Sequence, residues 1–388
     1  MEGFLKTPYG TQDFLPKQAA AKRAIENRLA RLFASYGYEE VVTPTMEFLD
    51  TLKMSGGTIE QNLFKMFDQK NQTLALHHEM TTPIARLVVS RMKDAELPIK
   101  LSYNTSVFRF RQNQPQRQCE FYQAGVELLG ISNAFADAEI VALAAQSLEV
   151  AGLKEFKICL GQVEYANGLM EQFSLSDEVQ ANIKAAIESH DIVGLEKIVK
   201  GIEGAEVLKF IPRLHGGVEI LRRADKLADN KKSYMALQNL SDIYTLLENY
   251  GVADKIIFDL GIIRDFDYYT GMVFEAYAPN VGYSLAGGGR YDHMLKDFGM
   301  ACPATGFALG IERILQARER QGIMEDFSGR DVYIGYHESQ MNAAIKKATE
   351  LRAAGKTVEL SLTPQTLEDA ARIGLTKNFG EMIYLNEQ

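Results

Sequence analysis

Two strand-like segments joined by a polar loop constrain the fold of this chain more than any other stretch. Residues 101–130 read LSYNTSVFRFRQNQPQRQCEFYQAGVELLG and predict two antiparallel strands around that loop. Side chains on a strand alternate between its two faces. One face of the second strand is apolar, and we expect it to pack on the core: Tyr122, Ala124, Val126 and Leu128.

The opposite face of the second strand is partly polar and carries Phe121, Gln123, Gly125 and Glu127. An amide and a carboxylate lie two strand steps apart on it, and the glycine between them leaves room. A carboxylate and an amide carbonyl that converge over an open floor suit a ligand's ammonium group, because both accept hydrogen bonds. The alternative is the solvated face of an antiparallel sheet, which is a common arrangement. The spacing alone leaves both interpretations open.

Composition favours a globular chain with one large and one small domain. The chain has 388 residues, 46% of them hydrophobic and 24% charged, which is ordinary for folded proteins. Its net charge of −9 argues against binding a polyanion over a wide surface, although a local basic groove is compatible with it.

Cysteine usage and hydropathy indicate the compartment. The three scattered cysteines, Cys119, Cys159 and Cys302, give neither a disulfide framework nor a metal-ligand spacing, which fits a reducing cytoplasm. No apolar run approaches the length of a membrane span, and the first residues lack the features of a signal peptide. We therefore expect a cytoplasmic protein with no membrane association and no metal.

The order of helix and strand patterns predicts an α+β fold. Before residue 325 the expected elements are a helix at 17–36, a strand at 41–43, a hairpin at 64–76, a helix at 134–152, a helical insertion at 163–250, strands after 255, and a helix beginning near Gly310. Residues 331–388 alternate strand and helix, which predicts a small parallel sheet. The expected domains are 1–325, including the insertion, a linker at 326–330, and 331–388.

Two polar clusters precede the first expected helix after the hairpin. Glu79 and Thr81 stand just before Pro83, where acids and hydroxyls are favoured as helix N-caps for their own sake. His77 and His78 are adjacent, so they point to opposite sides of a strand and make a poor metal pair.

Further candidates lie in the second half of the chain. Arg264 is a single cation amid apolar residues and is followed by Tyr268 and Tyr269, although aromatic pairs in strands are more often core than ligand contacts. Arg313 lies in the first turn of a helix, where a cation is electrostatically unfavourable. That position indicates a purpose beyond stability.

Six segments together resemble class II histidyl-tRNA synthetases over nearly the whole chain. GYEEVVTPTME is similar to the first motif of that class, which builds the dimer, FRFRQNQPQRQCEFYQAGVE to the second and ATGFALGIERIL to the third. LHHEMT resembles the LRPEGT element, and RDFDYYTGMVFE and GGRYD resemble the two histidine-specific elements. Six segments in the right order are specific. They imply a class II synthetase-like antiparallel sheet flanked by helices, with a truncated anticodon-binding-like α/β domain at residues 331–388.

The resemblance also implies that a histidine-like pocket survives. Carried over by position, its residues are Glu79, Gln123 and Glu127 for the amino group or imidazole, Thr81 beside them, Arg264 on the carboxylate side, Tyr268 and Tyr269 around the ring, and Arg109 for a carboxylate or α-phosphate.

The departures from the synthetase pattern fall on the ATP site. The second motif of the synthetases reads Phe-Arg-x-Glu, and its Glu holds the adenine amino group; here that position is Arg111. Arginine has only donors, so it cannot accept the adenine N–H hydrogen bond. The Gly-Arg of the second motif's loop is here Gln116-Arg117, and LHHEMT has lost the Arg and the Pro of LRPEGT.

A synthetase-like body with an amino acid pocket, a damaged ATP site and a shortened tRNA domain resembles the regulatory subunits of ATP phosphoribosyltransferase (HisZ). The resemblance implies a chain without chemistry of its own and without cofactor. It implies a homodimer, joined to the short-form catalytic subunit (HisG) in a hetero-octamer that starts histidine biosynthesis. L-Histidine would be the feedback effector, and no tRNA is expected as a partner. The alternative is an active histidyl-tRNA synthetase.

Overall fold

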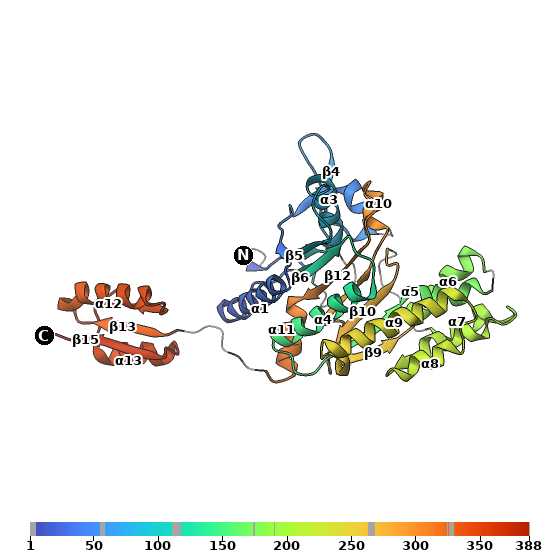
Figure 1. The fold of residues 1–388 in the computed structure, drawn as a ribbon. Coiled ribbons are helices and arrows are strands. Elements are labelled where there is room, and N and C mark those ends of the chain that lie inside the picture. Colours follow the sequence, from blue (N-terminus) through green and yellow to red (C-terminus); the bar gives the residue numbers. More distant parts are fainter. Residues whose placement is uncertain are drawn as a thin grey trace. The chain divides into compact units, whose positions relative to one another are not determined.

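A computed structural model describes residues 5–54, 59–110, 118–173, 175–189, 191–262, 268–323, 325 and 330–387 of the chain (Figure 1). The chain divides into two compact units, one of residues 1–13 and 22–324 and the other of residues 14–21 and 325–388. Most of the predicted linker, residues 326–329, lies outside the described residues. The predicted domain bounds stay a prediction.

The larger unit is built on a nine-stranded, mostly antiparallel sheet, as the sequence predicted. In spatial order the strands are β1 (Glu39–Glu40), β5 (Ile99–Phe108), β6 (Glu120–Leu129), β12 (Ala304–Gly310), β11 (Ala286–Arg290), β10 (Met272–Tyr277), β7 (Lys157–Gln162), β9 (Ile256–Asp259) and β8 (His215–Gly216). Within the described strands of this sheet, only β1–β5 and β7–β9 pair in parallel.

One face of the sheet is covered by helices and holds the main hydrophobic core. The covering helices include α1 (Pro16–Ser35), α4 (Ala134–Val150), α5 (Val163–Glu171) and α9 (Lys231–Asn249) (Figure 1). The apolar face of β6 packs into this core through Ala124, Val126 and Leu128, with Tyr122 partly buried against it. The alternation read from the sequence is thereby confirmed.

The opposite face of β5 and β6 meets a second core. It packs against α3 (Thr81–Arg91) and α10 (Met294–Asp297). A three-stranded antiparallel sheet is formed by β2 (Met46–Phe48), β4 (Thr73–Leu76) and β3 (Lys65–Phe67), of which β3 and β4 are the predicted hairpin. The short helices α2 (Leu49–Lys53) and η2 (Ile59–Asn62) lie between β2 and β3 in the sequence.

The strand predicted at 41–43 is wrong in position. The first strand is β1 at Glu39–Glu40, which pairs in parallel with Leu101 and Ser102. The backbone N–H of Val41 still donates to the Ser102 carbonyl over 2.9 Å, but the regular pairing stops there. Pro44 has no N–H to continue a ladder, and the next strand, β2, pairs with β4 in the small sheet.

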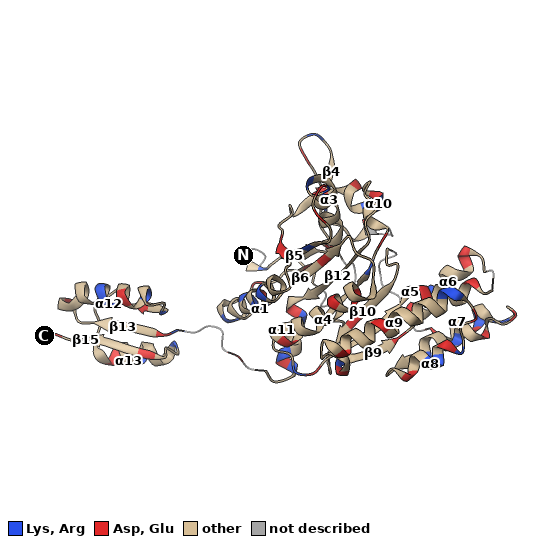
Figure 2. Ribbon diagram, viewed as in Figure 1, with Lys and Arg blue, Asp and Glu red and all other residues tan. Residues whose placement is uncertain are grey.

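The predicted insertion at 163–250 is helical. After α5 come α6 (Asp177–Glu188), α7 (Ile192–Val199), η3 (Ala205–Arg213), α8 (Glu219–Asp225) and α9, with only the two-residue β8 among the described residues there. Figure 2 shows basic and acidic residues interspersed along these helices. The short turn η4 (Ala253–Lys255) leads back to β9, and α11 (Ile311–Arg320) follows β12.

The smaller unit contains the predicted parallel sheet. The strand order is β14 (Val358–Leu360), β13 (Val332–Tyr336), β15 (Glu381–Leu385), and both pairings are parallel. The helices α12 (Met341–Ala353) and α13 (Leu367–Thr376) flank it, and the turn η5 (Glu338–Gln340) precedes α12 (Figure 1). Within the described ranges, none of the helices combines the length and apolar character needed to cross a bilayer.

Candidate functional site

A cavity of about 740 Å³ lies in the larger unit, on the face of β6 opposite to α1 and α4. It is lined by the start of α3, by β6, β11 and β12, by the start of α11, and by residues 9–12. Seven of the eight predicted site residues line it: Glu79, Thr81, Arg109, Gln123, Glu127, Tyr268 and Tyr269. The eighth, Arg264, lies outside the described residues.

Glu127 is the most deeply buried acid of this cavity, with 2% of its surface exposed. Its Oε1 accepts a 3.0 Å hydrogen bond from the Thr81 hydroxyl, and its Oε2 accepts one from the Tyr291 hydroxyl. Burial raises the pKa of Glu127 to about 8; the two hydroxyl groups lower it, and the neighbouring charge of Glu79 raises it further. The solvated-face alternative for this side chain is wrong.

Gly306 on β12 gives Glu127 the space it occupies. The two residues pair across the sheet. A Cβ atom at position 306 would lie 2.1 Å from the Glu127 Oε2 and 2.5 Å from the Val126 carbonyl oxygen. Only glycine leaves the carboxyl group of Glu127 in this position.

Glu79 caps α3 and lines the cavity at the same time. Its Oε2 accepts a 2.5 Å hydrogen bond from the Thr81 N–H, and its Oε1 accepts one of 3.0 Å from the Thr82 N–H. The N-cap residue itself is Met80, so Glu79 caps the helix from the position before it, in the predicted N-cap region. The carboxylate is 5% exposed and remains at the cavity wall, so capping does not exclude contact with a ligand.

The space predicted beside Gly125 is filled by an aromatic side chain. A Cβ at position 125 would lie 2.5 Å from the hydroxyl oxygen of Tyr103, which is 3% exposed and lines the cavity. Within the described part of the chain, the buried Oε1 of Gln123 has no hydrogen-bond partner. A ligand N–H group would satisfy this acceptor.

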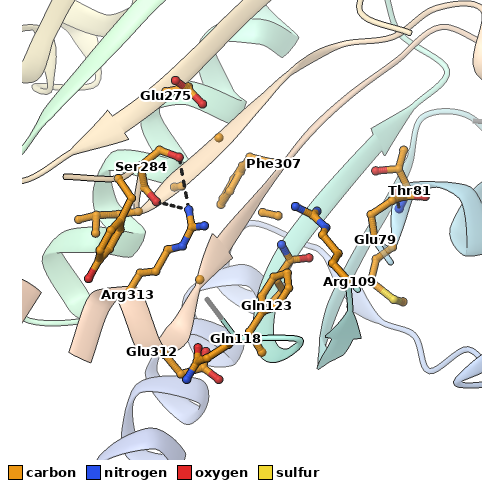
Figure 3. A pocket seen from close by; sticks show the side chains of 18 of the residues that line it. Glu79, Thr81, Arg109, Gln118, Gln123, Glu275, Ser284, Phe307, Glu312 and Arg313 are labelled. Carbon is orange, nitrogen blue, oxygen red and sulfur yellow. Dashed lines mark hydrogen bonds between the residues drawn. The ribbon is translucent and has the colours of Figure 1, made fainter. Parts of the chain in front are cut away.

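Arg109 and the two tyrosines border the same end of the cavity. The Nε of Arg109 donates to the His78 carbonyl over 2.9 Å, and its guanidinium lies 5.3 Å from the Phe121 ring. The rings of Tyr268 and Tyr269 lie 4.8 Å apart. Figure 3 shows Arg109 and Gln123 side by side, with Glu79 and Thr81 beyond them.

The far end of the cavity holds Arg313 and Glu312, both from the first turn of α11. The Nη1 of Arg313 donates to the Ser284 carbonyl over 2.6 Å, as drawn in Figure 3. Both carboxyl oxygens of Glu312 lie 3.0 Å from the Tyr122 N–H, and burial raises the pKa of Glu312 to about 7. The Arg313 guanidinium also lies 5.3 Å from the Tyr283 ring.

Several lining residues were missed by the sequence analysis. Tyr291 belongs to the GGRYD segment that was singled out, so a signal existed for it. Tyr103 reaches the cavity because it pairs with Gly125. Residues 9–12 are held there by a hydrogen bond of 2.7 Å, which the Gly10 carbonyl accepts from the Cys119 N–H. Glu312 belongs to the ATGFALGIERIL segment that was singled out, so a signal existed for it as well.

A metal site is not indicated among the described residues. They contain no group of three potential His, Cys, Asp or Glu ligands. The Nε2 of the buried His77 lies 2.7 Å from the Ser106 carbonyl. Burial lowers the pKa of His78 to about 4, so its imidazole is neutral at pH 7.

Known proteins resemble the chain in sequence and in structure. The family described as histidyl-tRNA synthetase matches residues 10–314. The ATP phosphoribosyltransferase regulatory subunit of Moorella thermoacetica is 42% identical, over 95% of both chains. That of Ruminiclostridium cellulolyticum is 36% identical, over 98% of this chain and 92% of its own.

Solved structures agree with these relatives. A Bacillus halodurans protein described as ATP phosphoribosyltransferase regulatory subunit/histidyl-tRNA synthetase superposes with a TM-score of 0.88 at 32% identity, covering 99% of both chains. The histidyl-tRNA synthetase of Nostoc reaches a TM-score of 0.83 at 22% identity, over 96% of this chain and 90% of its own, and shares the fold. The chain therefore belongs to the family of ATP phosphoribosyltransferase regulatory subunits, which here has the histidyl-tRNA synthetase fold.

Proposed function

We propose that this chain does no chemistry itself, is required for full activity of a short-form ATP phosphoribosyltransferase catalytic subunit, and confers feedback inhibition by L-histidine. The names of relatives up to 42% identical support the regulatory role. The holoenzyme would be a glycosyltransferase that carries out the first step of histidine biosynthesis in the cytoplasm.

The cavity supports L-histidine as the effector. Two carboxyl groups and an amide carbonyl, those of Glu79, Glu127 and Gln123, line one end and offer acceptors to an ammonium group and an imidazole N–H. Arg109 at the same end offers a cation to the ligand's carboxylate. The proposed site thus matches every polar group of a free histidine, and no cofactor is invoked.

Arg111 carries the proposal that the chain is not a ligase. In the synthetases that the sequence resembles, an acid at this position holds adenine, and here it is a guanidinium. Histidine activation needs ATP held in line with the carboxylate. Position 111 lies outside the described residues, so this support rests on the sequence.

Feedback follows if histidine binds one arrangement of the complex more tightly than another. A ligand shifts an equilibrium only by its differential affinity for the two states. In the proposed mechanism the occupied cavity favours the less active arrangement of the assembly, and the inhibited state in turn binds histidine more tightly.

The small sheet β2–β4–β3 supports the proposed homodimer. Paired residues on neighbouring strands face the same way, and the pairs here are apolar: Met46 with Leu76, Phe48 with Leu74, and Met66 with Leu74. Met46 and Phe48 are 50% and 49% exposed. A contiguous apolar face of this kind is typical of an interaction surface. We expect Phe48→Asp to convert a dimer into monomers in sedimentation velocity, and an unchanged dimer would place the interface elsewhere.

Reconstitution tests the function directly. The purified chain is mixed with a short-form catalytic subunit, and product formation from ATP and phosphoribosyl pyrophosphate is followed with and without L-histidine. We expect this chain to stimulate the reaction severalfold or more, and histidine to reverse the stimulation. Equal rates with and without the chain would overturn the proposal. Light scattering of the same mixture tests the proposed hetero-octamer.

An active histidyl-tRNA synthetase is the second candidate, because the synthetase family matches residues 10–314 and both Arg109 and Arg313 line the cavity. Histidine-dependent exchange of pyrophosphate into ATP separates the two candidates. We expect no exchange above background. Exchange at an ordinary enzymatic rate that is lost in Arg264→Ala would favour the ligase.

A further inference from the structure

The two acids at the histidine end of the cavity have different kinds of hydrogen-bond partner. Glu79 accepts from the backbone N–H groups of Thr81 and Thr82. Glu127 is bonded to the hydroxyl groups of Thr81 and Tyr291. A backbone N–H only donates, whereas a hydroxyl both donates and accepts.

This difference decides which of the two acids keeps its hydrogen bonds when it gains or loses a proton. Glu79 acts as an acceptor at both oxygens, which is the role of a carboxylate. Glu127 keeps both hydrogen bonds whether its carboxyl group is protonated or ionised, because either hydroxyl can turn to accept from it. Glu79 therefore suits a permanently charged ammonium group, and Glu127 suits a group that exchanges a proton.

The surroundings of Glu127 disfavour its anion in the empty cavity. The polar and titratable groups that act on it or contact it are Glu79 and Thr81 from the start of α3, Tyr103 from β5, Tyr291 after β11, and Tyr38, which precedes β1. None of these groups is a cation, and Glu127 is 2% exposed. The cation at this end of the cavity, Arg109, acts on Tyr103. With its pKa raised to about 8 by burial, Glu127 holds a proton at neutral pH.

We propose, on the basis of the function proposed above, that Glu127 recognises the effector by sharing one proton with its side chain, and so selects an amino acid that ends in a weakly basic ring. On binding, the O–H bond of the Glu127 carboxyl group breaks and an N–H bond forms on the ring nitrogen. The carboxylate that remains lies against the cationic ring. A ring without basicity leaves the proton on Glu127 and gains no ion pair.

The proton balance sets a pH window for binding. An imidazole side chain has a pKa of about 6.5. Between that value and about 8, the free acid carries the shared proton and binding exchanges none with solvent. Below the window the free ring carries its own proton, so one proton is released. Above it both groups are unprotonated, so one proton is taken up. Affinity therefore has a maximum between these values and falls by up to about tenfold per pH unit on either side.

Calorimetry of the full chain with L-histidine tests this inference, in pairs of buffers that differ in ionisation enthalpy. We expect release of most of one proton at about pH 5.5, almost none at about 7.2, and uptake near 8.7. Triazolylalanine, whose ring has the same shape but little basicity, should release no proton at the lowest pH. A histidine affinity that changes in one direction only across this range would overturn the inference.

Two variants keep the test sharp. Glu127→Gln should weaken histidine binding at least tenfold and abolish the proton uptake near pH 8.7, because glutamine cannot take up a proton. Glu312→Gln, at a buried acid of the far end, should keep the whole profile. Tyr291→Phe retains the ring but removes a hydroxyl that lowers the pKa of Glu127. The loss of histidine affinity at high pH should therefore begin at a higher pH.

The outcomes separate this inference from the function on which it rests. Proton uptake near pH 8.7 that persists in Glu127→Gln would overturn the inference alone. Absence of histidine binding at every pH, in a chain that still stimulates the catalytic subunit, would overturn the histidine effector and the inference while leaving the stimulating role.

Discussion

Glu127 and Glu312, two buried acids at opposite ends of the cavity, have different kinds of hydrogen-bond partner. At one end Glu127 is bonded to the side-chain hydroxyls of Thr81 and Tyr291. At the other end Glu312 is bonded to a backbone N–H and the neighbouring Arg313 to a backbone carbonyl. Glu79 and Arg109 also have backbone partners, so Glu127 is the exception among these charged residues. Hydroxyl partners can reorient around a ligand, whereas backbone partners cannot.

The difference separates the presence of a charged residue from its use in binding. Arg313 occupies the first turn of α11, where the sequence indicated a purpose beyond stability. Its bond to the backbone and its ring contact with Tyr283 give it a structural purpose. Arg109 has contacts of the same kinds, but Arg109 lies beside Glu79 and Arg313 lies away from it (Figure 3). We therefore expect substitutions at the Glu127 end to change ligand binding, and those at the Arg313 end to change mainly stability.

The largest expected contrast is between two glycines of the cavity wall. Gly306→Ala places a Cβ 2.1 Å from the Glu127 Oε2 and 2.5 Å from the Val126 carbonyl oxygen. Either the strand or the carboxyl group of Glu127 must therefore move. We expect histidine affinity to fall at least a hundredfold and the free energy of unfolding to drop by about 1–3 kcal/mol.

Gly282→Ala is the matched control at the other end, because a Cβ there meets nothing within 4 Å. Its affinity should stay within twofold and its stability within about 0.5 kcal/mol of the parent. Calorimetry and urea unfolding measure both variants. Equal losses of affinity and stability in Gly306→Ala and Gly282→Ala would show that the two ends of the cavity do not differ in this respect.

The next contrast is the pH dependence of stability. The pKa of Glu127 is raised from 4.5 to about 8 by folding, and that of Glu312 to about 7. Between the unfolded and folded values the native state holds a proton that the unfolded chain has released, so stability falls as pH rises. Each group contributes up to about 1.4 kcal/mol per pH unit in its range.

Variants at Glu127 and Glu312 separate the contributions of the two acids to the pH dependence of the free energy of unfolding. Glu127→Gln should flatten the decline from about pH 5 to about 8, whereas Glu312→Gln should flatten it only up to about 7. Urea unfolding at unit pH steps from 5 to 9 gives the curves. If both variants retain the parent's slope between pH 5 and 7, neither acid is protonated in the native state.

Local rules of strand geometry account for most of what the sequence predicted. The alternation along residues 121–128 separated a core face from a ligand face because side-chain direction on a strand repeats every two residues. The core face packs as expected, and Gln123 and Glu127 of the other face line the cavity. The family resemblance added Glu79 and Thr81, which no local rule distinguishes from an ordinary helix cap.

The residues that were missed depend on interactions between distant segments. Tyr103 reaches the cavity because the β5–β6 register places it opposite Gly125, and the sequence does not give that register. Tyr291 reaches Glu127 across a separation of 164 residues. The strand misplaced at 41–43 has the same cause, since β1 is defined by its pairing with β5.

A smaller contrast is expected between the two arginines of the wall. Arg109 lies at the histidine end, where we propose that it meets the ligand carboxylate, so Arg109→Gln should weaken binding about tenfold through a lost charge-assisted hydrogen bond. Arg313→Gln should leave affinity within twofold and lower stability by about 1 kcal/mol, because it removes the bond to the Ser284 carbonyl. Calorimetry and unfolding decide; weaker binding in Arg313→Gln alone would reverse the assignment of the two ends.

The smallest contrast concerns two hydroxyl groups. The Thr81 hydroxyl donates to Glu127 over 3.0 Å and lowers the pKa of that carboxyl group. Thr81→Val keeps the shape of the side chain and removes the hydrogen-bond donor. We therefore expect a roughly threefold loss of histidine affinity, which is less than the roughly tenfold that one full hydrogen bond can contribute. The same substitution should shift the fall in affinity at high pH to a higher pH. The Glu127 carboxylate loses a hydrogen-bond donor, so the pKa of Glu127 rises.

Ser284→Ala is its control at the other end. The Arg313 Nη1 lies 2.6 Å from the Ser284 carbonyl and 3.5 Å from its hydroxyl, so the backbone bond carries the interaction and survives in alanine. Affinity and melting temperature should both be unchanged. A loss in Ser284→Ala equal to that in Thr81→Val would mean that the far end also reads its ligand through a hydroxyl, and the distinction between reorienting and fixed partners would fail at the position where it is easiest to detect.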